Sequence, residues 1–403
     1  MQMTLKSSDQ SDDDQQFQTD VEIVHERVVH SKLIDSIMDP ELETEDQSIQ
    51  DEAATEQDEA ATEQDEEIEI DELEIDFSEE SPVYNITRKD NFQWRKQNYD
   101  PQPCLFHHKV PDVVLNRTPY QIFSQYITKA LIIDMSTFTN MYALQKGVSF
   151  EHTNPEEILR LIGTHILMGV LKFSQLKMYW NSAIKVNTIS SCITRDRFFQ
   201  LRANFHLIDN NTITPSCQDK FIKVRSIIDA VRLRCLQLPV EEVVSVDEQM
   251  IPFKGHLSVK QYIKNKPKPW GIKVFVLAGK TGYPYDFLVY QGSTTNISSF
   301  DKVTLGCGAA TVLHLCKRLS KPGHEPYFDN YFSTYQLFEI LKDKEINATG
   351  TVSVNRFNKP SFSTDLILRK KGRGSSEELA SRDGKIVIVK WQVGFVIMFN
   401  VFL

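Results

Sequence analysis

At 403 residues with 41% hydrophobic side chains, the chain is long enough for two or three domains, and no apolar stretch is long enough to cross a membrane by itself. Its net charge of −10 divides between an acidic segment, residues 1–80, with 29 acidic and 3 basic residues, and a basic remainder with 26 acidic and 42 basic residues. This division excludes a uniformly acidic protein and favours a body that binds polyanions, most often nucleic acid.

Residues 1–80 show no hydrophobic periodicity and contain a tandem repeat, in which residues 51–57 recur as residues 58–64. A segment so rich in charge and so poor in aromatic residues buries too little apolar surface to offset the entropy of ordering. We therefore predict a disordered acidic tail. Two roles stay open for it: a solubilising tail, or a segment that folds back over the basic body and competes with nucleic acid.

The six cysteines are scattered, with no Cys-x-x-Cys pair and no secretory signal before them. This pattern indicates a reducing compartment and thiols that form no disulfide framework. Cys104 lies near His107 and His108, but a structural zinc ion takes four ligands and no second pair follows within range. We therefore expect no zinc site.

The residues from 118 to 240 show the periodicity of helices. Three helices are predicted, over residues 118–134, 154–171 and 219–238. The second has the strongest start, because Asn154 suits an N-cap, Pro155 suits the first helical position and Glu157 is placed to bond back to the cap. The third carries lysines and arginines around one apolar face, which we interpret as a solvated surface with direct DNA contact as the alternative.

After residue 240 the pattern becomes that of strands. Apolar or alternating runs predict strands at residues 243–246, 272–278 and 286–290, then a helix at 308–319, a strand at 325–328, a helix at 334–342 and a strand at 348–354. This order is that of a ribonuclease H-like core. The predicted fold class is therefore α/β, with a ribonuclease H-like core preceded by a mainly α-helical domain and the disordered acidic tail.

Two aspartates, Asp247 and Asp329, each stand at the end of a run that is predicted to be a buried strand. A buried carboxylate needs a partner, because isolating it costs roughly several kcal/mol or shifts its pKa. In a ribonuclease H-like core these two positions converge, and two carboxylates are ligands for a hard cation such as Mg²⁺. Glu248 is not expected to join them, because successive side chains of a strand point to opposite faces.

Many short segments match one known family in a single order and with similar gaps. They are Thr139–Ala143, Tyr179–Trp180, Arg195–Phe198, Asp219–Lys220, Asp247–Glu248, Phe253–Gly255, Lys266–Pro267, Trp270–Lys273, Tyr290–Gly292, Phe328–Thr334, Thr349–Val352 and Val389–Trp391. Through them the chain resembles the piggyBac transposases and the host proteins derived from them, over roughly two thirds of its length. One such match alone is weak, but the ordered set is specific.

The resemblance implies a DDE/D transposase that acts on double-stranded DNA in the nucleus, with a helical domain for dimerisation and DNA binding before the catalytic core. In that family three aspartates hold two Mg²⁺ ions, which stabilise the attacking and leaving oxygens of an in-line displacement. Asp247 matches the first of these catalytic, metal-binding aspartates and Asp329 the second. A homodimer is left open, and no small-molecule substrate is implied.

After Trp391 the chain departs from the family pattern, which continues with an Asp-Asn pair, another strand and later the third aspartate. Here Gln392 and an apolar run up to Leu403 follow. We interpret the sequence as a C-terminally truncated relative and expect no autonomous catalysis, because losing a member of a catalytic set costs orders of magnitude in rate. The alternatives are an active Mg²⁺-dependent transposase whose third aspartate lies in further sequence, and a non-catalytic protein-interaction module.

Two basic groups are predicted to contact nucleic acid. The first lies between the first and third predicted strands beside Tyr262 and Trp270, and comprises Lys254, Lys260, Lys264, Lys266 and Lys268. These lysines would hold phosphates near the metal site, with a solvated hairpin as the alternative. The second group, either a nuclear localisation signal or a phosphate-binding patch, comprises Arg369, Lys370, Lys371 and Arg373.

Five segments are therefore expected along the chain. They are an acidic tail (1–80), a linker (81–117), a helical dimerisation and DNA-binding domain (118–240), a ribonuclease H-like core (241–360), and the start of an insertion domain with a divergent apolar tail (361–403).

Overall fold

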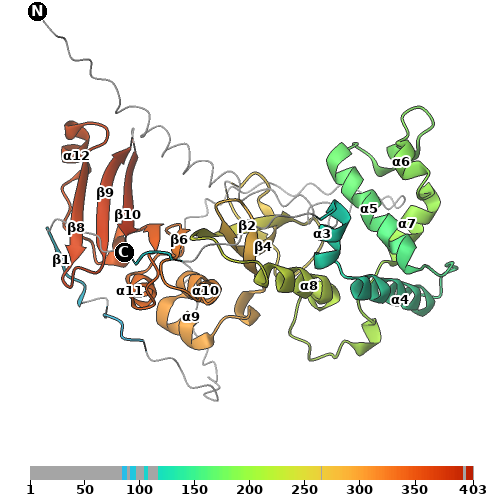
Figure 1. Ribbon diagram of the computed structural model, residues 1–403, viewed down its shortest axis with the longest axis horizontal. Coiled ribbons are helices and arrows are strands. Elements are labelled where there is room, and N and C mark those ends of the chain that lie inside the picture. The colour runs from blue at the N-terminus through green and yellow to red at the C-terminus, as the bar shows by residue number, and fades with distance from the viewer. Residues whose placement is uncertain are drawn as a thin grey trace, which may run out of the picture.

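The computed structural model describes residues 84–88, 91–96, 104–107, 117–264, 266–393 and 396–402, with side chains up to residue 392. The predicted disordered tail lies outside these residues. Figure 1 shows three parts in a row: a group of helices at one end, a sheet covered by helices in the middle, and further strands at the other end. No helix among the described residues is long and apolar enough to cross a membrane.

The helical part is built from six helices in the described residues, four of which start at a residue whose side chain caps the helix. It contains α3 (Pro119–Tyr126), α4 (Lys129–Gln145), α5 (Pro155–Leu171), α6 (Asn187–Ser190), α7 (Arg195–Asn204) and α8 (Arg225–Leu236), with 3-10 turns at Leu176–Trp180, Asn210–Thr212 and Ile222–Val224. The helix predicted over 118–134 is wrong as one element, because the chain leaves helical geometry at Ile127 and Thr128 caps a new helix.

The predicted start of α5 is confirmed, since the Asn154 side chain accepts a hydrogen bond from the Glu157 backbone N–H at 3.0 Å. Glu157 does not bond back to the cap, however. Its carboxylate accepts bonds from Arg197 at 2.6 and 2.7 Å and so ties α5 to α7. The helix predicted from residue 219 begins later, at Arg225, because Asp219 instead accepts hydrogen bonds from the Phe221 backbone and the Arg225 guanidinium.

All strands of the described residues belong to one sheet. They are β1 (Trp94–Arg95), β2 (Val243–Pro252), β3 (Gln261–Tyr262), β4 (Trp270–Gly279), β5 (Pro284–Val289), β6 (Glu325–Phe328), β7 (Thr349–Thr351), β8 (Ser376–Ser381), β9 (Val387–Val393) and β10 (Val396–Phe402). The order is β1-β8-β9-β10-β7-β6-β2-β4-β3, and β5 also pairs with β4. Within it, β5, β4 and β2 are antiparallel neighbours, while β6 and β7 run parallel to β2, as expected for a ribonuclease H-like core.

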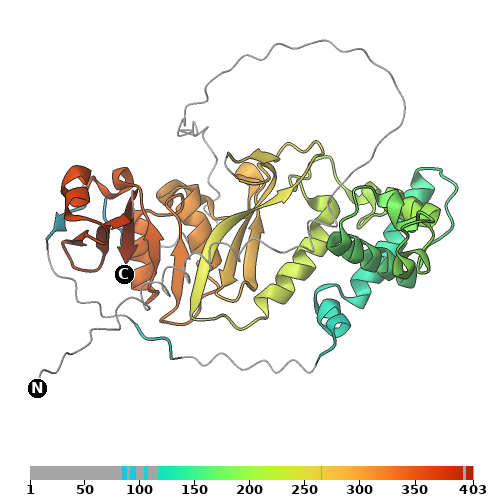
Figure 2. The same cartoon turned by 90° about the horizontal axis from the view of Figure 1, so that it is seen from above.

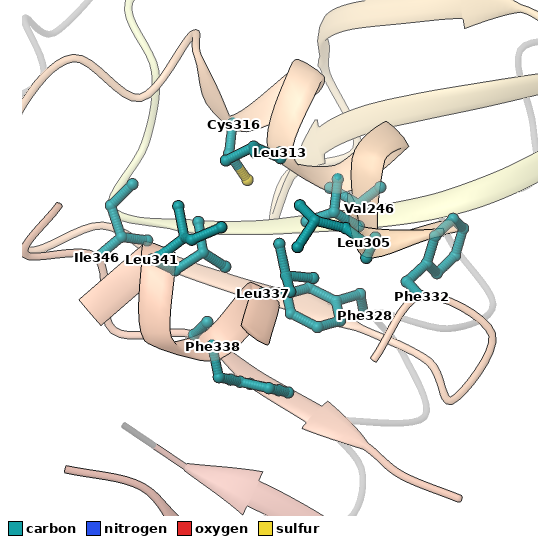
Figure 3. Packing of buried hydrophobic residues seen from close by; sticks show 14 of the residues in the cluster. Val246, Leu305, Leu313, Cys316, Phe328, Phe332, Leu337, Phe338, Leu341 and Ile346 are labelled. Atoms are coloured by element: carbon teal, nitrogen blue, oxygen red, sulfur yellow. The ribbon is translucent and has the colours of Figure 1, made fainter. Parts of the chain in front are cut away.

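Both faces of the central strands are buried, which explains why residues 274–278 of β4 are all apolar. Phe275 and Leu277 face one cluster, which includes α9 (Ser299–Leu305), α10 (Cys307–Cys316) and α11 (Tyr335–Asp343), while Val274 and Val276 face another with α8. Figure 2 shows these helices on opposite sides of the sheet. In Figure 3, Val246 of β2 and Phe328 of β6 pack among α10 and α11 side chains. Each such fully buried side chain stabilises the fold by about 1.5–3 kcal/mol.

Part of the segment expected to be a linker packs on the core. Residues 84–88 and 91–96, named here the N-terminal strap, cross α11 and reach β8. The Thr87 backbone N–H donates to Glu339 at 2.8 Å, and the Phe92 ring, 4% exposed, stacks 4.0 Å from the Tyr335 ring. The Trp94 indole donates to a backbone carbonyl at 2.9 Å. These contacts join residues far apart in sequence, so the hydrophobic pattern of the strap gave no sign of them.

The last part of the described chain forms structure beyond the core. α12 (Asp365–Lys371) precedes β8 and β9, and β10 pairs with β9 on one side and with β7 on the other. The apolar tail is thus a strand that joins the core to β8 and β9. All six cysteines are free.

Candidate metal and nucleic-acid site

The sheet brings the two predicted aspartates to one edge. In the parallel pair of β2 and β6, Val244 lies opposite Pro326 and Val246 opposite Phe328. Asp247 is the next residue of β2, and Asp329 directly follows the end of β6 at Phe328. Buried apolar side chains thus fix the register, and the register brings these two positions to the same edge of the sheet.

The loop that carries Asp329 is held in place from several sides. The Asp329 carboxylate accepts a hydrogen bond from the Tyr331 backbone N–H at 2.9 Å. Arg356 donates to the carbonyls of Asn330 at 2.9 Å and Tyr331 at 2.8 Å. A Cβ on Gly308 would lie 2.6 Å from the Tyr331 carbonyl oxygen, so α10 approaches the loop closely because a glycine stands there. Asp329 is therefore preorganised.

Both carboxylates resist ionisation. Burial, followed by repulsion from the Glu248 carboxylate, raises the pKa of Asp247 to about 6, although the Glu248 backbone N–H donates to Asp247 at 2.8 Å. Burial and the same repulsion raise the pKa of Asp329. Carboxyl groups in this setting gain from a bound cation, because its charge offsets both the burial and the repulsion from Glu248.

Glu248 takes more part in the site than alternation along the strand predicted. Its carboxylate forms an ion pair with Lys266 at 3.1 Å, in which the Glu248 side chain is 15% exposed and the Lys266 side chain 37% exposed. Its charge nevertheless raises the pKa of both Asp247 and Asp329. Alternation sets the direction of neighbouring side chains, but Coulomb repulsion in poorly solvated surroundings acts over several ångströms.

Asp247 and Asp329 are candidate ligands for one hard divalent cation. Among the described residues no group of three His, Cys, Asp or Glu side chains is arranged to hold a metal ion. Mg²⁺, however, is commonly held by one or two carboxylates and completes its shell with water and substrate phosphates. Asp247 and Asp329 supply such a pair. The incomplete zinc motif is not assembled within these residues either, and His108 lies outside them.

The five predicted lysines lie on one segment next to the carboxylates. Residues 254–264 and 266–270, named here the lysine hairpin, connect β2 to β4 and include β3. The Lys266 ammonium reaches Glu248, and the Lys260 ammonium lies 5.3 Å from the centre of the Trp270 ring. The remaining three, Lys254, Lys264 and Lys268, are exposed. This surface therefore adjoins the carboxylate edge.

The second basic group lies elsewhere. Arg369, Lys370, Lys371 and Arg373 are exposed at the end of α12, where Lys371 lies 3.7 Å from Glu377. In the sheet, β9, β10, β7 and β6 separate the following strand, β8, from β2. The structure thus does not bring this group to Asp247 and Asp329.

Two further basic residues border the site, and the sequence gave little sign of either. Lys273 of β4 places its ammonium 5.3–5.4 Å from the ring centres of Phe275, Tyr290 and Tyr331, and burial lowers its pKa. The alternation of β4 places Lys273 on the same face as Phe275, and this was the one indication in the sequence that Lys273 points toward the buried face. Nothing in the local sequence marks Arg356 as the residue that holds the Asp329 loop.

Two basic residues of α8 form ion pairs with aspartates of the same chain. Arg232 pairs with the buried Asp286 of β5 at 2.6 Å, and Arg225 pairs with Asp219 at 2.6 Å. The Arg232 pair attaches α8 to the core and the Arg225 pair attaches it to the preceding loop, which argues against the alternative that these two residues contact DNA.

Comparison with known proteins shows to which family the chain belongs. The family model described as Transposase IS4 matches residues 118–400, well over half of the chain. Human piggyBac transposable element-derived protein 3 is 30% identical over 304 residues, which cover 73% of this chain and 50% of that protein. The chain belongs to the piggyBac transposase family. A second member of the piggyBac family, human piggyBac transposable element-derived protein 2, is 30% identical over 282 residues, or 68% of this chain and 46% of that protein.

A solved piggyBac transposase shares the fold. The structure of its synaptic complex with hairpin DNA matches this chain with a TM-score of 0.59 and 23% identity, over 70% of this chain and 60% of that one. This likeness confirms the predicted α/β fold with a ribonuclease H-like core. The chain spans about half the length of the curated piggyBac relatives that it matches.

Proposed function

We propose that this piggyBac-family chain binds double-stranded DNA, with the lysine hairpin on the phosphates and Asp247 and Asp329 holding a Mg²⁺ ion beside the bound strand. The observation that carries the proposal is the position of Lys266, whose contact with Glu248 at 3.1 Å joins the lysine hairpin to the carboxylate edge. Phosphates held by the hairpin thus lie next to the aspartates.

The chemistry of the two parts is complementary. A phosphodiester beside two ionised carboxylates is repelled, and Asp247 and Asp329 already have raised pKa values without it. A bound Mg²⁺ would supply positive charge to both the carboxylates and a phosphate oxygen. Lys266 compensates Glu248, and the exposed lysines hold the neighbouring phosphates without discriminating between base sequences.

The shared fold with a transposase solved on hairpin DNA supports the proposal that this chain also meets DNA. We extend it to a nuclear location, with the exposed group at the end of α12 as the signal, and to self-association through the helical part. A fluorescent fusion that leaves the nucleus when Arg369, Lys370, Lys371 and Arg373 are replaced by alanine would support the location, and one that stays would contradict it.

Salt-dependent DNA binding tests the main proposal. We expect the full chain to bind a labelled duplex in fluorescence anisotropy, with an affinity that falls as salt rises. Replacing the three exposed hairpin lysines, Lys254, Lys264 and Lys268, by alanine is expected to lower the slope of log K against log salt by about 1 for each lysine that contacts a phosphate.

A matched control uses three exposed lysines away from the hairpin, Lys280, Lys317 and Lys344. Alanine at these positions changes net charge equally, so only the hairpin variant is expected to lose affinity strongly. Equal losses in the two triple variants would mean a diffuse charge effect, and absence of duplex binding at low salt would refute the proposed function.

Metal-dependent strand cleavage is the second candidate function, favoured by the adjacency of Asp247 and Asp329 on neighbouring strands. Nicking of a supercoiled plasmid with Mg²⁺ or Mn²⁺ that disappears in Asp247→Ala would support it. Binding without any metal-dependent nicking would leave the chain a DNA-binding member of the family.

A further inference from the structure

Two aromatic side chains stand exposed together on the lysine hairpin. Tyr262 of β3 and Trp270 of β4 are cross-strand partners, and each is 55% exposed. Their ring centres lie 4.9 Å apart with planes inclined by 50°. An exposed tryptophan beside an exposed tyrosine leaves apolar ring surface in water, an arrangement typical of binding sites.

The pair stands on a rigid base. Val259, 7% exposed, anchors the hairpin in the apolar cluster on the α8 side of the sheet. The Ile263 N–H donates to the Pro269 carbonyl at 2.9 Å and closes the loop between the two strands. A Cβ on Gly271 would lie 2.2 Å from the Ile251 carbonyl oxygen, so β4 lies directly against β2 next to Trp270. The aromatic faces therefore keep a fixed position relative to the sheet.

A positive charge lies beside these rings. The Lys260 ammonium lies 5.3 Å from the Trp270 ring centre and donates to the Lys254 carbonyl at 3.4 Å. Farther along the same hairpin, Lys266 reaches Glu248, next to Asp247. The aromatic pair and the lysine that reaches the carboxylate edge thus belong to one hairpin.

We propose that Tyr262 and Trp270 form a binding site for an unpaired base of a single-stranded segment that adjoins the duplex on the lysine hairpin. The inference rests on the proposed function, because the lysines must first hold the DNA backbone. A base inside a duplex has both faces covered by its neighbours, whereas an unpaired base offers a free π face. Aromatic rings with nearby cations bind such faces with little sequence preference.

Anisotropy titrations with two DNA molecules test the inference: a blunt duplex, and the same duplex with a short single-stranded extension. The full chain is expected to bind the extended duplex roughly tenfold more tightly, within the range of stacking one or two bases on aromatic side chains. The double variant Tyr262→Ala with Trp270→Ala is expected to lose this preference and to keep the affinity for the blunt duplex. Phenylalanine at both positions is expected to retain the preference.

Two controls separate stacking from damage to the fold. Leucine at both positions keeps apolar contacts without a π face, so it is expected to lose the preference. Tyr283→Ala removes a tyrosine that is 58% exposed beyond the opposite end of β4, and it is expected to change neither affinity.

A wild-type chain that binds both DNA molecules equally would overturn the inference and leave the proposed function standing. An alanine variant that weakens both complexes equally would also overturn it, since the rings would then serve duplex binding or folding. If the wild-type chain binds neither molecule, the proposed function fails and this inference fails with it.

Discussion

Asp247→Asn is expected to stabilise the protein at neutral pH. Burial and repulsion raise the pKa of Asp247 from 3.8 to about 6. An unfolded chain releases this proton near its ordinary pKa, so the contribution of Asp247 to stability is fully present below pH 4 and is lost as the pH rises through about 6. This pKa shift of about two units corresponds to about 3 kcal/mol in the free energy of unfolding, because one pKa unit is about 1.4 kcal/mol.

Urea unfolding followed by tryptophan fluorescence at several pH values measures this effect. At pH 7.5 the variant is expected to exceed the wild type in free energy of unfolding by up to about 3 kcal/mol, because Asp247 is then ionised and asparagine is neutral. Near pH 4 both side chains are neutral in the folded protein, so the difference is expected to be close to zero. Asp134→Asn, an exposed position on α4, is the control and is expected to change stability by less than about 0.5 kcal/mol.

Adding Mg²⁺ tests the same prediction in a second way. A cation that binds the folded wild type stabilises it by mass action, so Mg²⁺ is expected to narrow the difference between wild type and Asp247→Asn. The reasoning is refuted by a variant that is no more stable than the wild type at pH 7.5. A gain of equal size at pH 4 and pH 7.5 also refutes it, because packing rather than charge would then be the cause.

Three further variants test the supports of the core and of the site. Phe92→Ala is expected to lower the free energy of unfolding by about 3–5 kcal/mol, because Phe92 is 4% exposed; a loss below about 1 kcal/mol would mean that the N-terminal strap does not dock. Arg232→Ala leaves the buried Asp286 without its ion pair and is expected to cost about 3 kcal/mol in urea unfolding, against less than about 1 for the exposed Arg195; equal losses would contradict this. Arg356→Ala frees the Asp329 loop and is expected to weaken Mn²⁺ binding about tenfold in calorimetric titration, so an unchanged affinity would count against a positioning role.

The strands of the core were predictable because their hydrophobic pattern reflects burial on both faces. From residue 274 to 278 the run in β4 is apolar, since Phe275 and Val276 face different clusters, and it could be recognised as a buried strand without any knowledge of the fold. The order of elements then implied the topology, and the topology placed Asp247 and Asp329 on neighbouring strands. The fold and the position of the two aspartates were thus accessible from the sequence.

Features that depend on distant contacts were not accessible. The strap is short, and its burial comes from Tyr335 and Glu339 of α11, more than two hundred residues away in sequence. Helix α9 has only seven residues, too few to show a clear helical period. Arg356 acts on backbone carbonyls, which leave no trace in the sequence pattern. The alternation of side chains along β2 also failed to predict the effect of Glu248, because its charge raises the pKa of Asp247 and Asp329 although neighbouring side chains point to opposite faces.

Iron-mediated backbone cleavage tests most directly whether Asp247 and Asp329 form one divalent-cation site. With Fe²⁺ in place of Mg²⁺ and with ascorbate and peroxide present, hydroxyl radicals cut the chain close to the bound metal. Cleavage is expected at both segments, around Asp247 and around Asp329, and either Asp247→Asn or Asp329→Asn is expected to abolish both cuts together. Cleavage at one segment alone, or two cuts that the variants remove independently, would contradict a shared site.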